Sequence, residues 1–390
     1  MQEQKGVMVL IFPVILAVFS TFLTMGIGFG VLPQLVHGQL GYGDIMVGIV
    51  LGAEDITALL SRSMAGRNTD LKGAKSSVNK GIYWTFLAGI LYICAGLTTN
   101  LPFIAFIQLL IARVFHGMGE SYLITGALTW GVGLTGVANT GKVMAWVGIS
   151  IYGGIGLGAP LGELLSSHWG VLMAFGGIIL FPLMGSLPMF NLPPIAAHAA
   201  KKEGSFFDVL RAIWQQGTAL ALSAVGYGCT ASFITLFFLA MHWGAASLAY
   251  TVFAAGFILA RLFFASFPDK YGGRLVGICS LVIEVGGQLI LWMAVNKAMA
   301  LAGVALSGIG FSLMFPAMGV EAVKKVKPEM RGSAMGAFTA FSDVALGLTG
   351  PAAGLIASLL GYHAIFLFGA ICSVVACILI VRKQIALSAM

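Results

Sequence analysis

The amino-acid sequence predicts an all-α membrane protein whose twelve transmembrane helices form two pseudo-symmetric six-helix bundles. Three observations lead to this prediction. Hydrophobic residues make up 59% of the 390 residues, apolar runs of membrane-spanning length recur along the chain, and a charged stretch of the first half returns in the second. The mean hydropathy of +0.97 and the charged fraction of 9% lie outside the range of soluble domains. No hydrophilic segment is long enough to fold as a separate soluble domain.

The apolar runs divide into spans of roughly twenty residues, the length that crosses the hydrocarbon core as a helix. The first run is too long for the core of a signal peptide, so we expect it to be retained. The cysteines lie inside apolar spans without metal-type spacing, which favours buried thiols over disulfides or a metal site. The expected spans are about 8–32, 43–62, 78–98, 101–123, 142–165, 168–190, 213–240, 246–266, 275–295, 299–322, 332–358 and 362–382.

The net charge of +7 is distributed asymmetrically between the two sides of these spans. If the N-terminus is cytoplasmic, the lysines and arginines of the loops fall on the cytoplasmic side, and the opposite side keeps only Lys297. This asymmetry follows the positive-inside rule and predicts that both termini are cytoplasmic. The basic charge is then an orientation signal, which argues against nucleic-acid binding.

An internal repeat relates the two halves of the chain. SRSMAGRNTDLKGAK (61–75) aligns with ARLFFASFPDKYGGR (260–274), and residues 141–162 align with 332–354. The first alignment pairs Arg62 with Arg261, Asp70 with Asp269, Gly73 with Gly272 and Lys75 with Arg274. We therefore expect an N-terminal bundle of residues 1–192, a cytoplasmic linker of 193–211 and a C-terminal bundle of 212–390. Two such halves imply a substrate path between them near the middle of the membrane, although a repeat alone does not prove transport.

The first charged loop, residues 61–75, contains residues suited to a cytoplasmic gate. Gly66 permits close backbone approach, Gly73 permits a tight turn, and Asp70 offers a carboxylate at a helix end. An exposed carboxylate that faces the N-terminus of another helix is stabilised by about 0.3–1 kcal/mol. A contact of this strength can hold a gate closed and still release it. We favour this latch for Asp70 and Gly73, whereas a basic loop that only sets topology explains the lysines.

This loop resembles the signature loop of the major facilitator superfamily, represented here by Gly66, Asp70, Gly73 and Lys75. Its second-half counterpart has Ala265 in place of the first glycine. The resemblance implies a paired cytoplasmic gate built from the aligned residues. In that gate Asp70 would face the start of helix eleven near Gly332, and Asp269 the start of helix five near Gly141.

Polar residues share one face of the expected fourth helix, where ARVFHGMGES places Arg113, His116, Gly117 and Glu120 at i, i+3, i+4 and i+7. The pattern resembles the helix-four motif of the same superfamily. An ionised arginine near the middle of the bilayer is costly, so it should face a cavity and have a partner. We favour a role for Arg113 in proton or substrate coupling, with His116 and Glu120 beside it. A fixed ion pair that holds the bundle together is the alternative.

The expected fifth helix carries GGIGLGAPLGE, with Gly154, Gly158 and Gly162 four residues apart and Pro160 between them. It resembles the glycine–proline motif of the drug/proton antiporter branch, which implies export. Tight helix packing explains the glycines equally well. The second-half stretch with Gly350, Pro351 and Gly354 is expected to pack and bend in the same way.

Further carboxylates fall within the expected spans: Glu54 and Asp55 in helix two, Glu284 in helix nine and Asp343 in helix eleven. Each should be protonated, paired or hydrated. Helices two and eleven border the domain interface in this fold, which makes Glu54, Asp55 and Asp343 candidates for proton coupling. Adjacent residues on a helix point about 100° apart, so Glu54 and Asp55 cannot both face one spot. Glu284 is expected to be structural, together with Gln288 one turn on.

We therefore expect a secondary active transporter that exports a small organic solute by alternating access, with a proton gradient as its energy source and no cofactor. LVHGQLGYG and LLSRSMAGRNTD resemble bacterial permeases of the YhhS/YfcJ type, which gives a class and no ligand. The resemblance implies a monomer in the bacterial inner membrane, not an enzyme. Proton-coupled nutrient uptake is the alternative, followed by a non-transporting sensor on the same fold.

Overall fold

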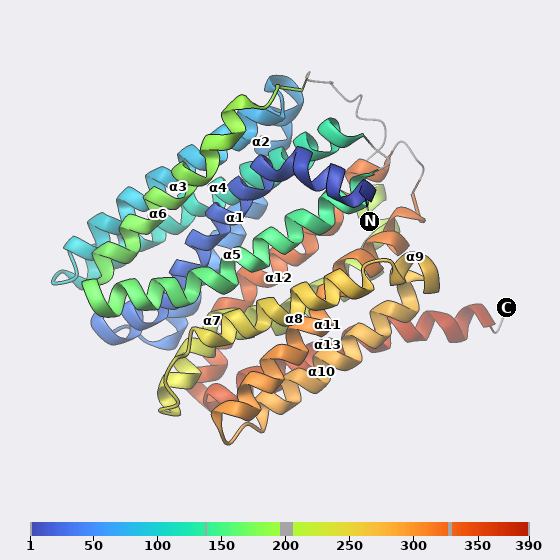
Figure 1. The fold of residues 1–390 in the computed structure, drawn as a ribbon. Coiled ribbons are helices and arrows are strands. Elements are labelled where there is room, and N and C mark those ends of the chain that lie inside the picture. The colour runs from blue at the N-terminus through green and yellow to red at the C-terminus, as the bar shows by residue number, and fades with distance from the viewer. Residues whose placement is uncertain (1, 137–138, 196–205, 327–329, 389–390) are drawn as a thin grey trace. The chain divides into compact units, whose positions relative to one another are not determined.

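The computed structural model describes residues 2–136, 139–195, 206–326 and 330–388, and every regular element in these ranges is a helix (Figure 1). The chain divides into two compact units, Met1–Ala200 (unit 1) and Lys201–Met390 (unit 2). Each of the expected spans falls on one helix, which confirms the predicted all-helical fold class. Part of the expected linker, residues 196–205, lies outside the described residues.

Unit 1 contains the first six spans. Helix α1 packs along α5, α4 packs against both α2 and α3, and α6 contacts α1 and α3. The elements are α1 (Gln2–Gln34) with the π-helical turn η1 (Leu35–Gln39), α2 (Asp44–Lys72), α3 (Ala74–Leu97), α4 (Pro102–Thr135), α5 (Thr140–Trp169), α6 (Val171–Ser186) and the 3₁₀ turn η3 (Leu187–Asn191).

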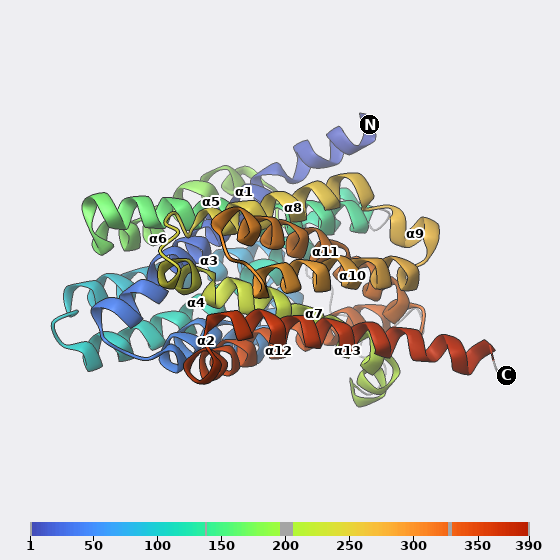
Figure 2. The ribbon, with the colours of Figure 1, turned by 90° about the horizontal axis from the view of Figure 1, so that it is seen from below.

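Unit 2 repeats this arrangement. Helix α7 packs along α12, α11 packs against both α8 and α10, and α13 contacts α7 and α10, as Figure 2 shows for α13. These pairs correspond in order to those of unit 1, so the sequence repeat is also a repeat of helix packing. The elements are α7 (Phe206–Ala240), α8 (Leu248–Phe264), the short α9 (Phe267–Tyr271), α10 (Gly273–Trp292), α11 (Lys297–Val323), α12 (Arg331–Leu360) and α13 (Tyr362–Ser388).

In the described part of the chain, 10 helical stretches are long and apolar enough to cross a membrane. The two other expected spans correspond to α8, which has only 17 residues, and to α2, whose apolar character is reduced by its charged side chains. The charged stretch that was expected to be a loop is itself largely helical. Helix α2 continues to Lys72, and Gly73, with φ of +84°, makes the turn into α3. In unit 2, Gly272 makes the same turn with φ of +86°.

The glycines of α5 lie against α1. A Cβ atom on Gly158 would lie 2.9 Å from the carbonyl carbon of Leu23 and 3.0 Å from the Cα of Gly26. Gly154 and Gly162 face Phe22 and Ile27 at similarly short distances. Small residues on both helices therefore allow their backbones to approach closely, as is common between membrane helices. This contact accounts for the glycine spacing by packing within unit 1.

We predict opposite effects of alanine at two helical glycines of unit 1. Gly158→Ala places a methyl group against the backbone of α1 and should destabilise the protein by about 1–3 kcal/mol. Gly176→Ala, on α6, meets no atom within 4 Å and should be neutral or slightly stabilising. Thermal unfolding of the purified variants measures the difference, and equal midpoints would contradict the close α1–α5 contact.

Candidate functional site

A buried ion pair joins α4 to α2 inside unit 1. The guanidinium of Arg113 forms an ion pair with the carboxylate of Glu54, and the two side chains are 0% and 1% exposed. Arg113 also donates hydrogen bonds from Nε to the carbonyl oxygen of Val50 at 3.1 Å and from Nη2 to that of Leu51 at 2.8 Å. The costly buried cation therefore has a counter-charge and backbone acceptors, all on one face of α2.

His116 extends this pair toward α1. Its Nδ1 lies 3.7 Å from Oε1 of Glu54, and its Nε2 lies 3.1 Å from the hydroxyl of Thr24 on α1. The ring of Tyr92, on α3, stands edge-on to the imidazole with centroids 6.1 Å apart. Four helices of unit 1 thus meet at one buried group of polar side chains, which we call the unit 1 polar cluster: Thr24, Glu54, Tyr92, Arg113 and His116.

Gly117 explains why this cluster can form. A Cβ atom at position 117 would lie 3.0 Å from the carbonyl carbon of Glu54 and 3.1 Å from the amide nitrogen of Ala58. The missing side chain lets α4 approach the backbone of α2 at the turn that carries Glu54. The spacing of Arg113, His116 and Gly117 therefore has a geometric basis: two polar side chains flank the carboxylate, and the glycine makes room for its backbone.

The structure distinguishes between the two adjacent carboxylates of α2. Glu54 is buried in the ion pair, whereas Asp55 points about 100° around the helix axis and is half-buried. Glu120 is also half-buried, two turns beyond Arg113 on α4. Asp343 is 8% exposed on α12 and belongs to unit 2, and its role in proton coupling stays a prediction.

Two members of the cluster, Thr24 and Tyr92, were not predicted as site residues. Thr24 lies in an apolar helix with two other hydroxyl residues, Ser20 and Thr21, and both of those bond the carbonyl of Ala17 in their own helix. The contact that distinguishes Thr24 reaches His116 across 92 residues of chain, and no local pattern marks it. Tyr92 is a single buried phenol in an apolar span, where packing is the simpler expectation.

The basic gate residues contact their own units. Lys75 donates from Nζ to the carbonyl oxygens of Phe190 and Leu192, both at 2.9 Å. Arg274, its repeat partner, donates from Nη2 to the carbonyls of Ile380 and Val381. Each side chain thus ties the third span of its unit to the chain at the end of the sixth.

The other gate residues differ in burial. Asp70 and Asp269 are exposed, Arg62 is half-buried, and Arg261 is buried and donates to the carbonyl of Ser312 at 2.6 Å. The proposed partners of Asp70 and Asp269 belong to the opposite unit, so the latch stays a prediction. The side chains around Gly332 lie outside the described residues.

Glu284 occupies a different environment in the interior of unit 2. It is fully buried and accepts a hydrogen bond of 2.5 Å from the hydroxyl of Ser223. One turn on, the amide of Gln288 donates to the carbonyl of Gly226 at 3.0 Å and lies 3.3 Å from the hydroxyls of Thr230 and Ser307. Glu284 thus belongs to a network of hydroxyl and amide groups that joins α7, α10 and α11, which suits the structural role expected for it.

Comparison with known proteins identifies the class. The chain belongs to the Major Facilitator Superfamily, whose family model matches residues 14–245 and 217–384. This membership defines a membrane transporter of small molecules, not an enzyme.

Particular relatives share most of the sequence. The chain is 37% identical to the uncharacterized MFS-type transporter STM4428 of Salmonella typhimurium over 95% of both proteins. It is 40% identical to the uncharacterized MFS-type transporter YhhS of Escherichia coli K12 over 90% of this chain and 87% of YhhS.

Solved structures confirm the fold at much lower sequence identity. The nucleoside transporter NupG superposes with a TM-score of 0.74 at 15% identity, over 96% of this chain and 99% of NupG. The Escherichia coli fucose:proton symporter FucP gives a TM-score of 0.66 at 14% identity, over 97% of this chain and 99% of FucP.

We predict that the stability of unit 1 depends on Glu54 and much less on Asp55. Glu54→Ala leaves the buried guanidinium of Arg113 without its counter-charge and should cost about 3–5 kcal/mol. Asp55→Ala removes the half-buried neighbouring carboxylate and should cost about 1 kcal/mol or less. Unfolding of both variants in the same detergent measures the difference. Equal destabilisation would contradict the assignment of Glu54 as the partner of Arg113.

Proposed function

We propose that this transporter exports a small organic solute in exchange for protons by alternating access. The observation that carries the proposal is the unit 1 polar cluster, in which a carboxylate, an imidazole and a guanidinium are buried together between membrane-spanning helices. Ionisable groups in such places are costly and commonly mark proton or substrate paths. The fold and the family identify the chain as a transporter, and this cluster contains groups that can bind a proton.

The cluster suggests how proton binding could change the helix contacts. While Glu54 is ionised, its attraction to Arg113 holds the side chains of α2 and α4 together. A proton on Glu54 removes that attraction and leaves Arg113 with the carbonyls of Val50 and Leu51. His116, next to Glu54, can receive or deliver the proton. Proton coupling requires that the contacts of Glu54 differ between its ionised and protonated forms. It also requires two conformations in which solvent reaches Glu54 from opposite sides of the membrane.

The proposed direction of transport and the proposed orientation in the membrane are based on the amino-acid sequence. Export is proposed from the resemblance of the α5 glycine–proline stretch to the antiporter motif. Uptake remains the second candidate because FucP, which shares the fold, is described as a fucose:proton symporter and the same charges could serve it. We also propose a monomer in the bacterial inner membrane. The distribution of lysine and arginine favours a cytoplasmic location for both termini.

The coupling proposal predicts a loss of gradient-driven flux in Glu54→Gln. A thermal-shift screen of sugars, amino acids, metallophores and cationic drugs would first supply a substrate. In proteoliposomes, an imposed proton gradient should drive its flux through the wild-type protein, and the sign of the flux separates export from uptake. Glu54→Gln keeps the shape of the side chain but cannot ionise, so exchange down a substrate gradient should persist while proton-driven flux is lost.

The matched control is Asp44→Asn, which removes a carboxylate from the first turn of the same helix, beside His37. Its flux should depend on the gradient as in the wild-type protein. If Glu54→Gln were less stable yet still driven by the proton gradient, the Arg113–Glu54 pair would be a fixed structural contact. Coupling through Glu54 would then be excluded.

The proposed latch predicts a shift in conformational population. Asp70→Asn weakens a contact worth about 0.3–1 kcal/mol and should favour the inward-facing state by about two- to fivefold. Cysteine-accessibility labelling of the cytoplasmic side measures that shift. Arg67→Gln, which neutralises an exposed charge one turn earlier on α2, should leave labelling unchanged. Identical labelling in Asp70→Asn and the wild-type protein would rule out the latch.

A further inference from the structure

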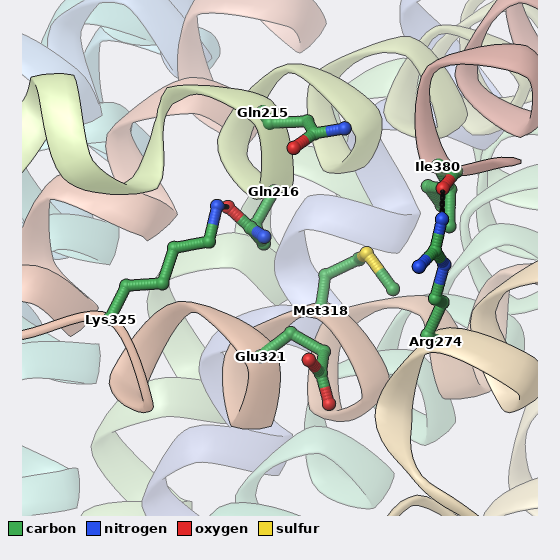
Figure 3. Close-up of a pocket in the computed structure, with 7 residues that line it drawn as sticks. All are labelled: Gln215, Gln216, Arg274, Met318, Glu321, Lys325 and Ile380. Atoms are coloured by element: carbon green, nitrogen blue, oxygen red, sulfur yellow. Dashed lines mark hydrogen bonds between the residues drawn. The ribbon is translucent and has the colours of Figure 1, made fainter. Parts of the chain in front are cut away.

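A pocket of about 140 Å³ lies within unit 2, where four helices end together (Figure 3). Its lining comes from the start of the spans at Val209–Ala240 and Gly273–Trp292, and from the ends of those at Lys297–Val323 and Tyr362–Val381. All four positions lie at the same side of the membrane. The pocket is therefore at the depth where the hydrocarbon core meets the lipid headgroups.

Hydrogen bonds to the end of α13 fix two sides of this pocket. Arg274 reaches the carbonyls of Ile380 and Val381, and the amide of Gln215 donates to the carbonyl of Leu379 at 2.6 Å. Met318, on α11, also lines the pocket and packs over Gly277 of α10. The lining thus combines fixed polar groups with an apolar part.

The charge in the pocket is positive. Figure 3 shows Arg274 and Lys325 extending from opposite sides, Arg274 toward Ile380 and Lys325 toward Gln216, whose Oε1 lies 2.9 Å from the ammonium. The carboxylate of Glu321, which also lines the pocket, is paired with Lys324 at 2.9 Å. The pocket is therefore lined by two cations, Arg274 and Lys325, and by one carboxylate whose charge is neutralised by Lys324.

Arg274 has donors beyond those that bind α13. A guanidinium carries five N–H groups, and the contacts to Ile380 and Val381 use one of its terminal nitrogens. Its Nε is buried and has no hydrogen-bond partner among the described residues. The guanidinium therefore keeps donors that an anion could use, and phosphate matches the fork of N–H groups that arginine presents.

The surroundings of the pocket favour a lipid as the source of that phosphate. Trp214 and Leu275 are next in sequence to Gln215 and Arg274, and they are 54% and 55% exposed. Tryptophan is enriched where membrane proteins meet the headgroup region. Acyl chains can lie against these exposed apolar side chains, whereas a water-soluble phosphate has no acyl chain to make such contacts.

We propose that this pocket binds the phosphate of an anionic phospholipid headgroup. Basic pockets between membrane helices on the cytoplasmic side are suited to such headgroups. The lipid would bridge α10, through Arg274, and the turn that follows α11, through Lys325. It would stabilise unit 2 by binding only its folded form. The site is independent of the proposed proton coupling.

Native mass spectrometry of the full chain in detergent tests this site, with dioleoylphosphatidylglycerol as probe and dioleoylphosphatidylcholine as the zwitterionic comparison. The wild-type protein should retain one phosphatidylglycerol and bind phosphatidylcholine more weakly. Arg274→Gln and Lys325→Gln should each weaken phosphatidylglycerol binding about fivefold, the effect of one basic residue near an anionic membrane surface. If Arg274→Gln does not fold, Lys325→Gln carries the test alone because it leaves the contacts to α13 intact.

Lys270→Gln is the matched control, because Lys270 is an exposed cation at the same end of unit 2 that lies over the ring of Tyr271, outside the pocket. It should bind phosphatidylglycerol like the wild-type protein. The proposal is overturned if all three variants bind alike, or if phosphatidylcholine binds as tightly as phosphatidylglycerol.

Soluble phosphates separate the two possible sources of the anion. Glycerol 3-phosphate and inorganic phosphate, at concentrations equal to the lipid, should fail to displace phosphatidylglycerol. Neither has acyl chains that could contact Trp214 and Leu275. Displacement by either would show that the pocket recognises phosphate alone and would contradict the lipid assignment.

Discussion

The buried pair of Arg113 and Glu54 determines how α2 and α4 meet in the interior of unit 1. An arginine inside a membrane-spanning bundle requires a counter-charge and hydrogen-bond acceptors, and α2 supplies both through one carboxylate and two backbone carbonyls. Gly117 is needed because this contact brings the backbones of α2 and α4 close together. His116 and Thr24 then connect the pair to α1. Removing one partner of such a pair costs more than the pair contributes, because the other charge remains buried.

The two units share their helix packing but differ in their interior chemistry. Each unit pairs its first span with its fifth and packs its fourth against its second and third. In both, a basic residue at the start of the third span ties it to the end of the sixth. Unit 1, however, buries an ion pair with a histidine beside it, whereas unit 2 surrounds Glu284 with hydroxyl and amide groups. This difference is the reason for placing proton chemistry in unit 1 and a structural network in unit 2.

The sequence was sufficient for the fold because apolar run length and repeated charged stretches are local signals. It also placed Arg113 and His116 on one face, since helical spacing fixes that relation. It could not choose between Glu54 and Asp55, because the choice depends on how α2 is rotated against α4. Thr24 and Tyr92 were missed because their contacts join distant helices. The extent of α2 was also underestimated, since the helix ends at Gly73, which makes the turn, and not where the apolar run ends.

We propose Glu54 as the group in unit 1 that exchanges the coupled proton. Infrared difference spectroscopy of the reconstituted protein across a pH change observes this directly, because a protonated carboxyl group has a C=O stretching band that its carboxylate lacks. Other carboxyl groups of the chain absorb in the same region, so we expect one component of this band, present in the wild-type protein and in Asp55→Asn, to be missing in Glu54→Gln. A Glu54→Gln spectrum that keeps every component of the wild-type band would contradict this role of Glu54, since the proton would then reside on another carboxylate.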